Sequence, residues 1–85
     1  MWYLGAFDKE SEILVRDYPL IGLDTATLKD LLEFGDSYEI DGIQYPPEAG
    51  GYDVPLSILP RLTKYIVGDF AVDSSCDYQV EYYRD

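Results

Sequence analysis

The side chains that could do chemistry in this 85-residue chain are its carboxylates, one thiol and its phenols, because the sequence contains no histidine. Without an imidazole, a serine or cysteine nucleophile lacks the usual base that titrates near neutral pH. Two carboxylates can act as acid and base, but only in a cleft that shifts one pKa, and a chain this short leaves little room for such a cleft. We therefore expect no enzymatic activity.

Metal and cofactor sites are also not expected from the sequence. Cys76 is the single cysteine, so the chain cannot form an internal disulfide or a tetrahedral zinc site, and we expect this side chain to be buried or half-buried. The sequence contains neither a D-x-[DN]-x-[DN]-G calcium loop nor a glycine-rich phosphate loop before a helix. We predict a protein without metal or cofactor.

Carboxylates dominate the charge of the chain, with 17 Asp and Glu against 6 Lys and Arg and a formal net charge of -11. Residues 30–60 contain seven acids and no Lys or Arg, and residues 69–81 are a second acid-only run. A field of this sign repels nucleic acid and anionic membranes, and it steers a basic protein surface toward the molecule. The alternative is that the acids serve solubility alone.

The nine tyrosines are the second informative feature. Tyr38, Tyr45 and Tyr52 fall within the first acid-only run, and Tyr83 shares with Glu81 the face opposite the apolar one in the C-terminal strand. Rings beside carboxylates are typical of a protein-binding surface, although each tyrosine taken singly could be an ordinary strand residue. The predicted partner-binding residues are Asp36, Tyr38, Glu39, Asp41, Tyr45, Glu48, Tyr52, Asp53, Asp77, Glu81 and Tyr83.

The composition, 47% hydrophobic and 15% aromatic, indicates a folding chain and not a disordered acidic tail. Its length allows one domain, residues 1–85, with a single small core. The apolar residues 1–7 lack a basic flank and meet Asp8 too early for a signal peptide or a membrane span. We expect a monomeric cytoplasmic protein that binds neither membrane nor nucleic acid directly.

The first half of the chain predicts a hairpin followed by a helix. Two apolar runs, Trp2–Phe7 and Ile13–Tyr18, flank a polar stretch and are typical of paired antiparallel strands. Leucines then recur at helical spacing over Thr25–Phe34, where Asp24 is the expected N-cap and Gly35 the expected stop.

The middle of the chain carries the strongest local signal. Asp41-Gly42 lies between the alternating segments 38–40 and 43–45, which predicts a short hairpin with a type I′ turn. The alternative is an irregular loop that happens to contain Asp-Gly. Residues 46–52 are rich in Pro and Gly and predict a mobile loop without regular structure.

The last third predicts a second helix and two strands. Ser57 is the expected cap of a helix over Ile58–Val67 that stops at Gly68. Residues 70–72 and 78–82 are typical of strands. The predicted fold is α+β, a small antiparallel sheet made of the N-terminal hairpin and the C-terminal strands, with two helices packed on one face.

This small, acidic chain with one expected domain resembles bacterial immunity proteins of polymorphic-toxin and contact-dependent growth inhibition systems. More narrowly, the strand pair of residues 2–15, the step Tyr18-Pro19-Leu20 into the helix that contains residues 28–32, and the aromatic C-terminal strand resemble one uncharacterised domain family seen among such antidotes. Such proteins are small, acidic, cytosolic antidotes to nuclease toxins. The resemblance implies a basic toxin domain as partner, but it assigns no functional residue because binding surfaces diverge widely in these families.

We therefore expect an antidote that blocks the substrate-binding surface of a basic toxin. A nuclease is the expected class, because such proteins concentrate Lys and Arg around their phosphate sites. Two alternatives remain open: a nucleic-acid mimic that inhibits a defence or nucleic-acid-processing enzyme, and a non-inhibitory acidic regulatory subunit. A mimic would space its carboxylates like phosphates and would not interleave them with tyrosines.

Overall fold

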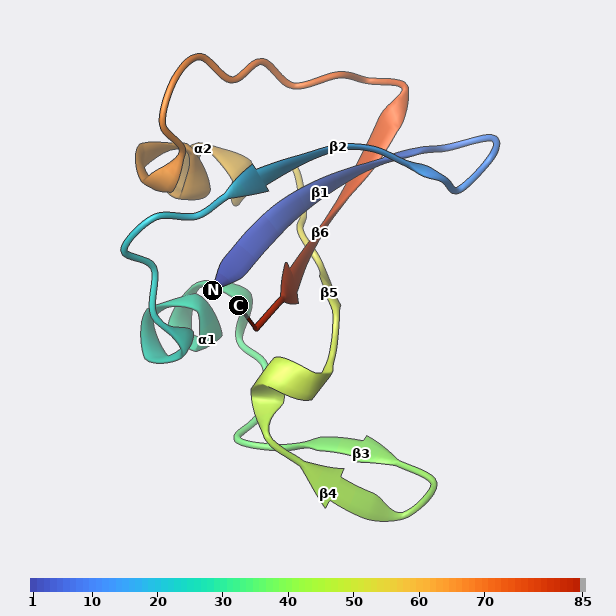
Figure 1. The fold of residues 1–85 in the computed structure, drawn as a ribbon, viewed down its shortest axis with the longest axis vertical. Helices are drawn as coiled ribbons and strands as arrows, with labels where there is room; N and C mark the ends of the chain where they lie inside the picture. Colours follow the sequence, from blue (N-terminus) through green and yellow to red (C-terminus); the bar gives the residue numbers. More distant parts are fainter. Residues whose placement is uncertain (85) are drawn as a thin grey trace.

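The computed structural model describes residues 1–84, which form a four-stranded antiparallel sheet, a separate two-stranded hairpin and two short α-helices (Figure 1). The sheet has the strand order β2-β1-β6-β5. These strands are β1 (Trp2–Asp8), β2 (Leu14–Pro19), β5 (Tyr52–Asp53) and β6 (Cys76–Tyr82). The predicted small α+β fold is confirmed, and β5 is a strand that begins where the sequence predicted a loop.

The first hairpin closes through the side chain of Asp8, the last residue of β1. The Asp8 carboxylate accepts hydrogen bonds from the backbone N–H groups of Glu10 and Ser11, both at 2.9 Å. These two bonds satisfy donors that the β-ladder leaves free, and they hold the pKa of Asp8 below its ordinary value. The hairpin prediction is confirmed, with the second strand shifted by one residue to Leu14–Pro19.

The core lies on one face of the sheet, because the register places three apolar or aromatic pairs in successive rows. Trp2, Leu4 and Ala6 of β1 face Tyr82, Val80 and Tyr78 of β6, respectively. Leu28 of α1 (Thr25–Leu32), together with Leu59 and Leu62 of α2 (Leu59–Leu62), is buried in the same cluster. Both helices therefore pack on this face, as predicted.

The first helix begins as expected and ends earlier than expected. The Asp24 carboxylate accepts the N–H of Thr27 at 2.8 Å, which confirms it as the N-cap. The helix ends at Leu32, where Glu33 adopts a left-handed conformation and its N–H still bonds to the carbonyl of Lys29. The predicted extension to Phe34 with a stop at Gly35 was wrong, because the backbone turns at Glu33.

The second helical segment is shorter than predicted. The α-helix covers one turn, Leu59–Leu62, and continues as the 3-10 helix η2 (Thr63–Tyr65). Ser57 makes no cap, since the residue at the N-cap position is Ile58 and it forms no side-chain hydrogen bond to the helix. The segment contains an α-helical bond, from the Thr63 N–H to the Leu59 carbonyl, together with i to i+3 turns such as the one from the Arg61 N–H to the Ile58 carbonyl.

The predicted strand at residues 70–72 was also wrong. Strand β6 pairs with β1 along its whole length and with β5 at Gln79 and Val80, and residues 70–72 join neither ladder. Phe70 instead packs edge-on against Tyr18 and Tyr78, with ring centroids 5.0 and 5.8 Å apart. Through Phe70, the segment packs against the hydrophobic core without forming a strand.

The central hairpin forms as predicted. Strands β3 (Tyr38–Ile40) and β4 (Ile43–Tyr45) pair around Asp41 and Gly42, whose φ angles of 51° and 80° are those of a type I′ turn. The following segment has more structure than expected, because it contains the 3-10 helix η1 (Pro47–Ala49) and then β5.

Candidate protein-docking site

The second face of the four-stranded sheet carries no helix, and none of its residues belongs to the core cluster. We call it the open face. It consists of Tyr3, Gly5, Phe7, Leu14, Asp17, Asp53, Asp77, Gln79, Glu81 and, just beyond β6, Tyr83. No Lys or Arg projects from the described strands on this side, since Arg16 pairs with Ala6 and points to the opposite face. The open face is therefore both uncovered and acidic.

Aromatic rings occupy the middle of the open face. The Phe7 ring lies over Gly5, where a Cβ atom would stand only 2.9 Å from Phe7 Cε2 and 3.1 Å from Leu14 Cδ1. The Tyr3 and Tyr83 rings meet edge to face, with centroids 5.3 Å apart. Because residue 5 has no side chain, the Phe7 ring can occupy the space above it, and this ring and the Tyr3–Tyr83 pair form an apolar patch with carboxylates beside it.

Tyr83 connects the aromatic centre to the carboxylates. Its hydroxyl donates a 2.5 Å hydrogen bond to the Glu81 carboxylate. This bond, together with partial burial and the negative charges of Glu81 and Asp17, raises the pKa of Tyr83 above its ordinary value. The phenol is therefore neutral at physiological pH and remains a hydrogen-bond donor, while Glu81 keeps acceptor capacity for a basic side chain.

The β3–β4 hairpin, residues 38–45, forms a second candidate surface that we call the arm. One side of the arm is apolar, because cross-strand pairing places Tyr38 beside Tyr45 and Ile40 beside Ile43. Ile40 and Ile43 are 44% and 57% exposed. The other side is polar and internally hydrogen-bonded. There Ser37 donates to the Gln44 side-chain oxygen at 2.6 Å, and the Gln44 amide donates to Glu39 at 3.0 Å.

Tyrosines attach the arm to the body of the molecule. Tyr38 packs on Gly50 and meets the Tyr52 ring edge-on at 6.0 Å. Tyr52 stacks on Phe34 at 4.1 Å with an interplanar angle of 10°, and its hydroxyl donates to the carbonyl of Pro47 at 2.8 Å. Burial, with the nearby Tyr38 and Glu48, raises the pKa of Tyr52. These two phenols therefore have structural contacts that keep them half-buried.

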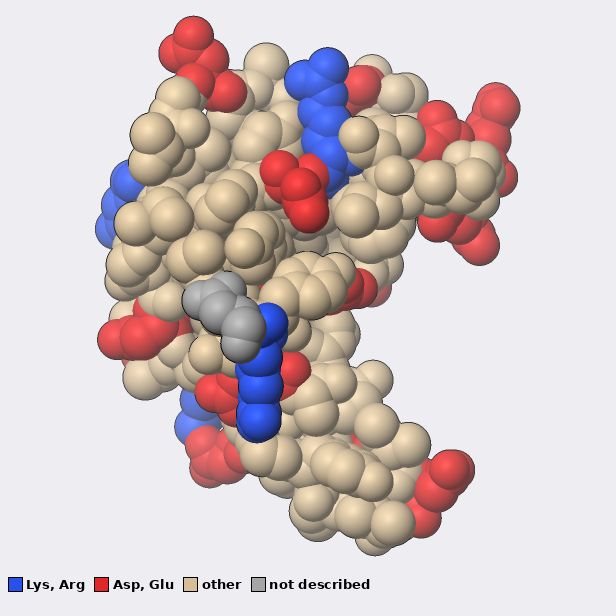
Figure 2. All heavy atoms as spheres, viewed as in Figure 1, with Lys and Arg blue, Asp and Glu red and all other residues tan. Residues whose placement is uncertain are grey.

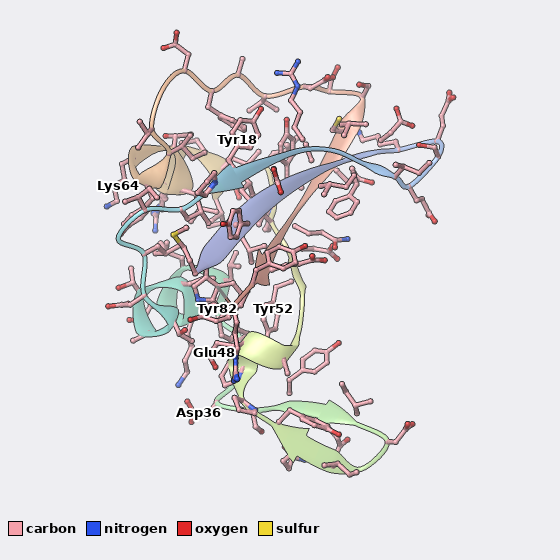
Figure 3. All side chains as sticks on the ribbon, viewed as in Figure 1. Tyr18, Asp36, Glu48, Tyr52, Lys64 and Tyr82 are labelled. Atoms are coloured by element: carbon pink, nitrogen blue, oxygen red, sulfur yellow. The ribbon has the colours of Figure 1, made fainter. Side chains whose placement is uncertain are left out.

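Glu48 lies where the arm joins the body, as Figure 3 shows, with Tyr52 beside it and Tyr82 on the adjoining strand. Trp2 Nε1–H donates to Thr25 Oγ1 at 3.0 Å, and the Thr25 hydroxyl donates in turn to Glu48 Oε2 at 2.7 Å. The Thr25 bond holds the pKa of Glu48 below its ordinary value. This relay links β1, α1 and η1 across the base of the arm.

The structure divides the predicted partner-binding residues into three groups. Asp53, Asp77, Glu81 and Tyr83 lie together on the open face. Glu39, Asp41 and Tyr45 lie on the arm, and Asp36 at its start forms an ion pair with Lys29 (Figure 3). Tyr38, Glu48 and Tyr52 hold the arm in place.

Sequence reasoning missed six of the ten residues of the open face, including two of its aromatic rings and one of its carboxylates. Tyr3, Phe7 and Asp17 come from the first hairpin, outside both acid-only runs. A usable signal existed in β1, where both alternating sets of side chains include large apolar or aromatic residues. Such a strand is covered on both faces or presents one of them to a partner.

Figure 2 shows the charges on one side of the molecule. Carboxylates are spread over the visible surface, with a dense group at the loop between β1 and β2 and others at the tip of the arm, and the surface is hollowed between these two projections. In this view the Lys and Arg side chains lie away from the hollow. Lys64, on η2, lies on the opposite side of the body from the arm tip (Figure 3).

Other kinds of site find little support in residues 1–84. No group of three or more potential ligands among them could hold a metal ion. No helix in this part of the chain has the length and apolar character needed to cross a membrane. Cys76 is buried, as expected. A recess of about 960 Å³ opens beside the arm, and Met1, Tyr45, Glu48 and Arg84 are among the residues that line it.

One sheet with one helical layer defines a small two-layer α+β domain. The chain belongs to the family described as Domain of unknown function (DUF7683), whose model matches residues 1–81. The matched range contains the arm and all of the open face except Tyr83. No curated protein and no solved structure matches the chain significantly.

Proposed function

We propose that this protein is an antidote that binds a basic toxin domain through the open face and blocks the toxin's substrate-binding surface. The observation that carries the proposal is an uncovered sheet face where three aromatic rings lie among four carboxylates and no basic side chain. An apolar centre with a charged rim is the usual anatomy of a protein-binding hot spot. The partner is a cytosolic protein with a Lys- and Arg-rich surface, as nucleases have.

Interleaving of rings and carboxylates favours this function over nucleic-acid mimicry. Tyr83 stands beside Glu81, and the Tyr3 and Phe7 rings lie between strands that carry acids at both edges. A mimic gains affinity mainly from charge, whereas an aromatic centre contributes apolar contact that salt does not screen. Raising the ionic strength should therefore slow association with the toxin and leave most of the affinity intact.

The test begins with the reading frames that flank the gene, where we expect one that encodes a toxin domain. Co-expression of this protein should restore growth to cells that produce the toxin domain, and the purified pair should bind in calorimetry. A toxin that kills equally with and without the protein, or a neighbouring gene product that never binds it, would refute the proposal. Affinity that collapses with salt would identify a charge mimic instead.

Matched charge reversals then locate the site. Asp17→Lys with Asp53→Lys changes the open face, and Glu39→Lys with Asp41→Lys changes the arm, with the same effect on net charge. We expect at least a hundredfold loss of toxin affinity for the first pair and less than a fivefold loss for the second. Circular dichroism and thermal unfolding confirm that both variants fold. The reverse ranking would move the site to the arm.

A further inference from the structure

The open face lacks the layer that usually covers such a sheet. Antiparallel sheets that expose one face to water normally alternate apolar and polar residues along each strand. Central strand β1 instead directs Tyr3, Gly5 and Phe7 outward, and carries Trp2, Leu4 and Ala6 on its inner face. A sheet face of this kind is commonly packed against a helical layer. The chain itself supplies helices only to the inner face.

The carboxylates of the open face frame a space of definite size. Asp17 on β2 and Asp53 on β5 belong to one cross-strand row, with Gly5 and Gln79 between them. Three interstrand spacings separate them, which is about 14 Å. Along β6, Asp77 and Glu81 are four residues apart, or about 13 Å. Tyr3 and Phe7 lie on β1, between the Asp17 and Asp53 strands, in the cross-strand rows of Glu81 and Asp77 respectively.

An α-helix with its side chains is about 10–12 Å wide, so it fits between Asp17 on β2 and Asp53 on β5, the two acidic rims of the open face. Long Lys and Arg side chains on its flanks can lay their stems along the rings and reach the rim carboxylates. A partner strand has a poorer place to bind. Edge strand β2 ends at Pro19, which has no N–H, and a bulge opposite Ala6 and Phe7 interrupts its ladder.

We propose that the partner segment covering the open face is a basic amphipathic helix. Its apolar stripe rests on Tyr3, Phe7 and Tyr83, and Lys or Arg residues on its two flanks pair with Asp17 and Asp53. This partner helix would form a third layer, on the side of the sheet opposite the protein's own two helices. This inference rests on the proposed function in one respect, the basic character of the partner.

The probe is a designed helical peptide of about 18 residues, with a Leu/Ala stripe flanked by Lys and Arg. The control has the same composition in scrambled order, which removes the stripe and keeps the charge. With the ¹⁵N-labelled protein, we expect amide shift changes over β1, β2 and β6 that spare the arm. The scrambled peptide should bind at least tenfold more weakly. Equal binding of both peptides, shifts centred on the arm, or no shifts at all would overturn the inference.

Two variants separate the contributions of the rings and the charges. Tyr83→Ser should weaken binding of the helical peptide about tenfold, and it should preserve the fold because Tyr83 is 45% exposed. Asp17→Asn with Asp53→Asn should reduce the dependence of binding on salt. Ile40→Ser with Ile43→Ser is the control on the arm and should change neither quantity. If the toxin is neutralised but contacts this face through a loop or strand, the proposed function stands and the helical partner is refuted.

Discussion

The open face and the arm are both acidic and rich in tyrosine, yet they use these residues differently. On the arm, Tyr38 packs against Gly50 and Tyr52. The side chains on the polar side of the arm hydrogen-bond to one another through Gln44. On the open face, Tyr83 is exposed and the carboxylates come from three different strands. Density of charge along the chain therefore does not identify the better docking surface, because strand pairing gathers distant residues.

Gly50→Ala, at the base of the arm, should destabilise the protein more than any single substitution on the open face. A methyl group at Gly50 would overlap the Tyr38 ring, so either the ring or the backbone must move. Overpacking of this kind costs about 1–3 kcal/mol, which urea denaturation measures. We also expect faster proteolysis within the arm and little change in toxin affinity. Unchanged arm proteolysis would show that Tyr38 does not anchor it.

Thr25→Val should destabilise the base of the arm by about 1–2 kcal/mol, because it leaves Trp2 Nε1 and Glu48 without their shared partner. Valine keeps the shape of the side chain and removes only its hydroxyl. Ser at the same position is the matched control and should retain most of the stability. Equal losses in Val and Ser variants would assign the effect to packing instead of the relay.

The pH dependence of stability should differ in sign between two groups. The bond from Thr27 holds the pKa of Asp24 below its ordinary value, so its contribution is present near neutral pH and is lost on acidification below about pH 4. The hydrogen bond to Glu81 raises the pKa of Tyr83, so the neutral phenol contributes to stability below about pH 10, and this contribution is lost as the pH rises further. Denaturation curves measured from acid to alkaline pH give the free energy of unfolding along both the acid limb and the alkaline limb of this pH profile.

Two variants assign these limbs. Asp24→Asn still caps α1 but cannot be protonated in this range, so the acid limb should become shallower with little change at pH 7. Tyr83→Phe should flatten the alkaline limb in the same way. An acid limb of full depth in Asp24→Asn would assign it to other carboxylates, such as Asp8 and Asp73, whose pKa values are also lowered.

Gly5→Ala is the counterpart of Gly50→Ala on the open face, and its effect on stability should be the smallest. The new Cβ would stand 2.9 Å from the free end of the Phe7 side chain, which can swing away. We expect a stability change below about 1 kcal/mol together with a clear loss of toxin affinity. A variant that binds normally would show that the position of the Phe7 ring does not matter for docking.

Local signals in the sequence predicted the elements that depend on local chemistry. Asp24 caps a helix because its carboxylate reaches an N–H three residues away, and Asp41-Gly42 forms a tight turn through its own φ angles. Failures occurred where distant contacts decide the outcome. Residues 70–72 form no strand, and Phe70 packs against Tyr18 and Tyr78 instead. Strand β5 forms because Tyr52 and Asp53 pair with Val80 and Gln79.

The candidate site was predicted in part for the same reason. Asp77 and Glu81 share one face of β6, and Tyr83 follows at the same alternation just beyond its end, so alternation alone groups them. Asp53 joins that face because it pairs with Gln79 of β6. Asp17 joins it because Gly5 of β1 pairs with Asp17 of β2 on one side and with Gln79 of β6 on the other. No pattern within one segment can reveal these neighbours.

The sequence by itself determined the sign of the charge, the helix cap, the turn of the arm and the apolar strands, because each depends on composition or on residues a few positions apart. The tertiary structure alone decided which carboxylates stand together and which phenols remain exposed. The physical reason is that strand order and helix placement are set by burial of one shared core, and the opposite face then takes whatever side chains the register directs outward.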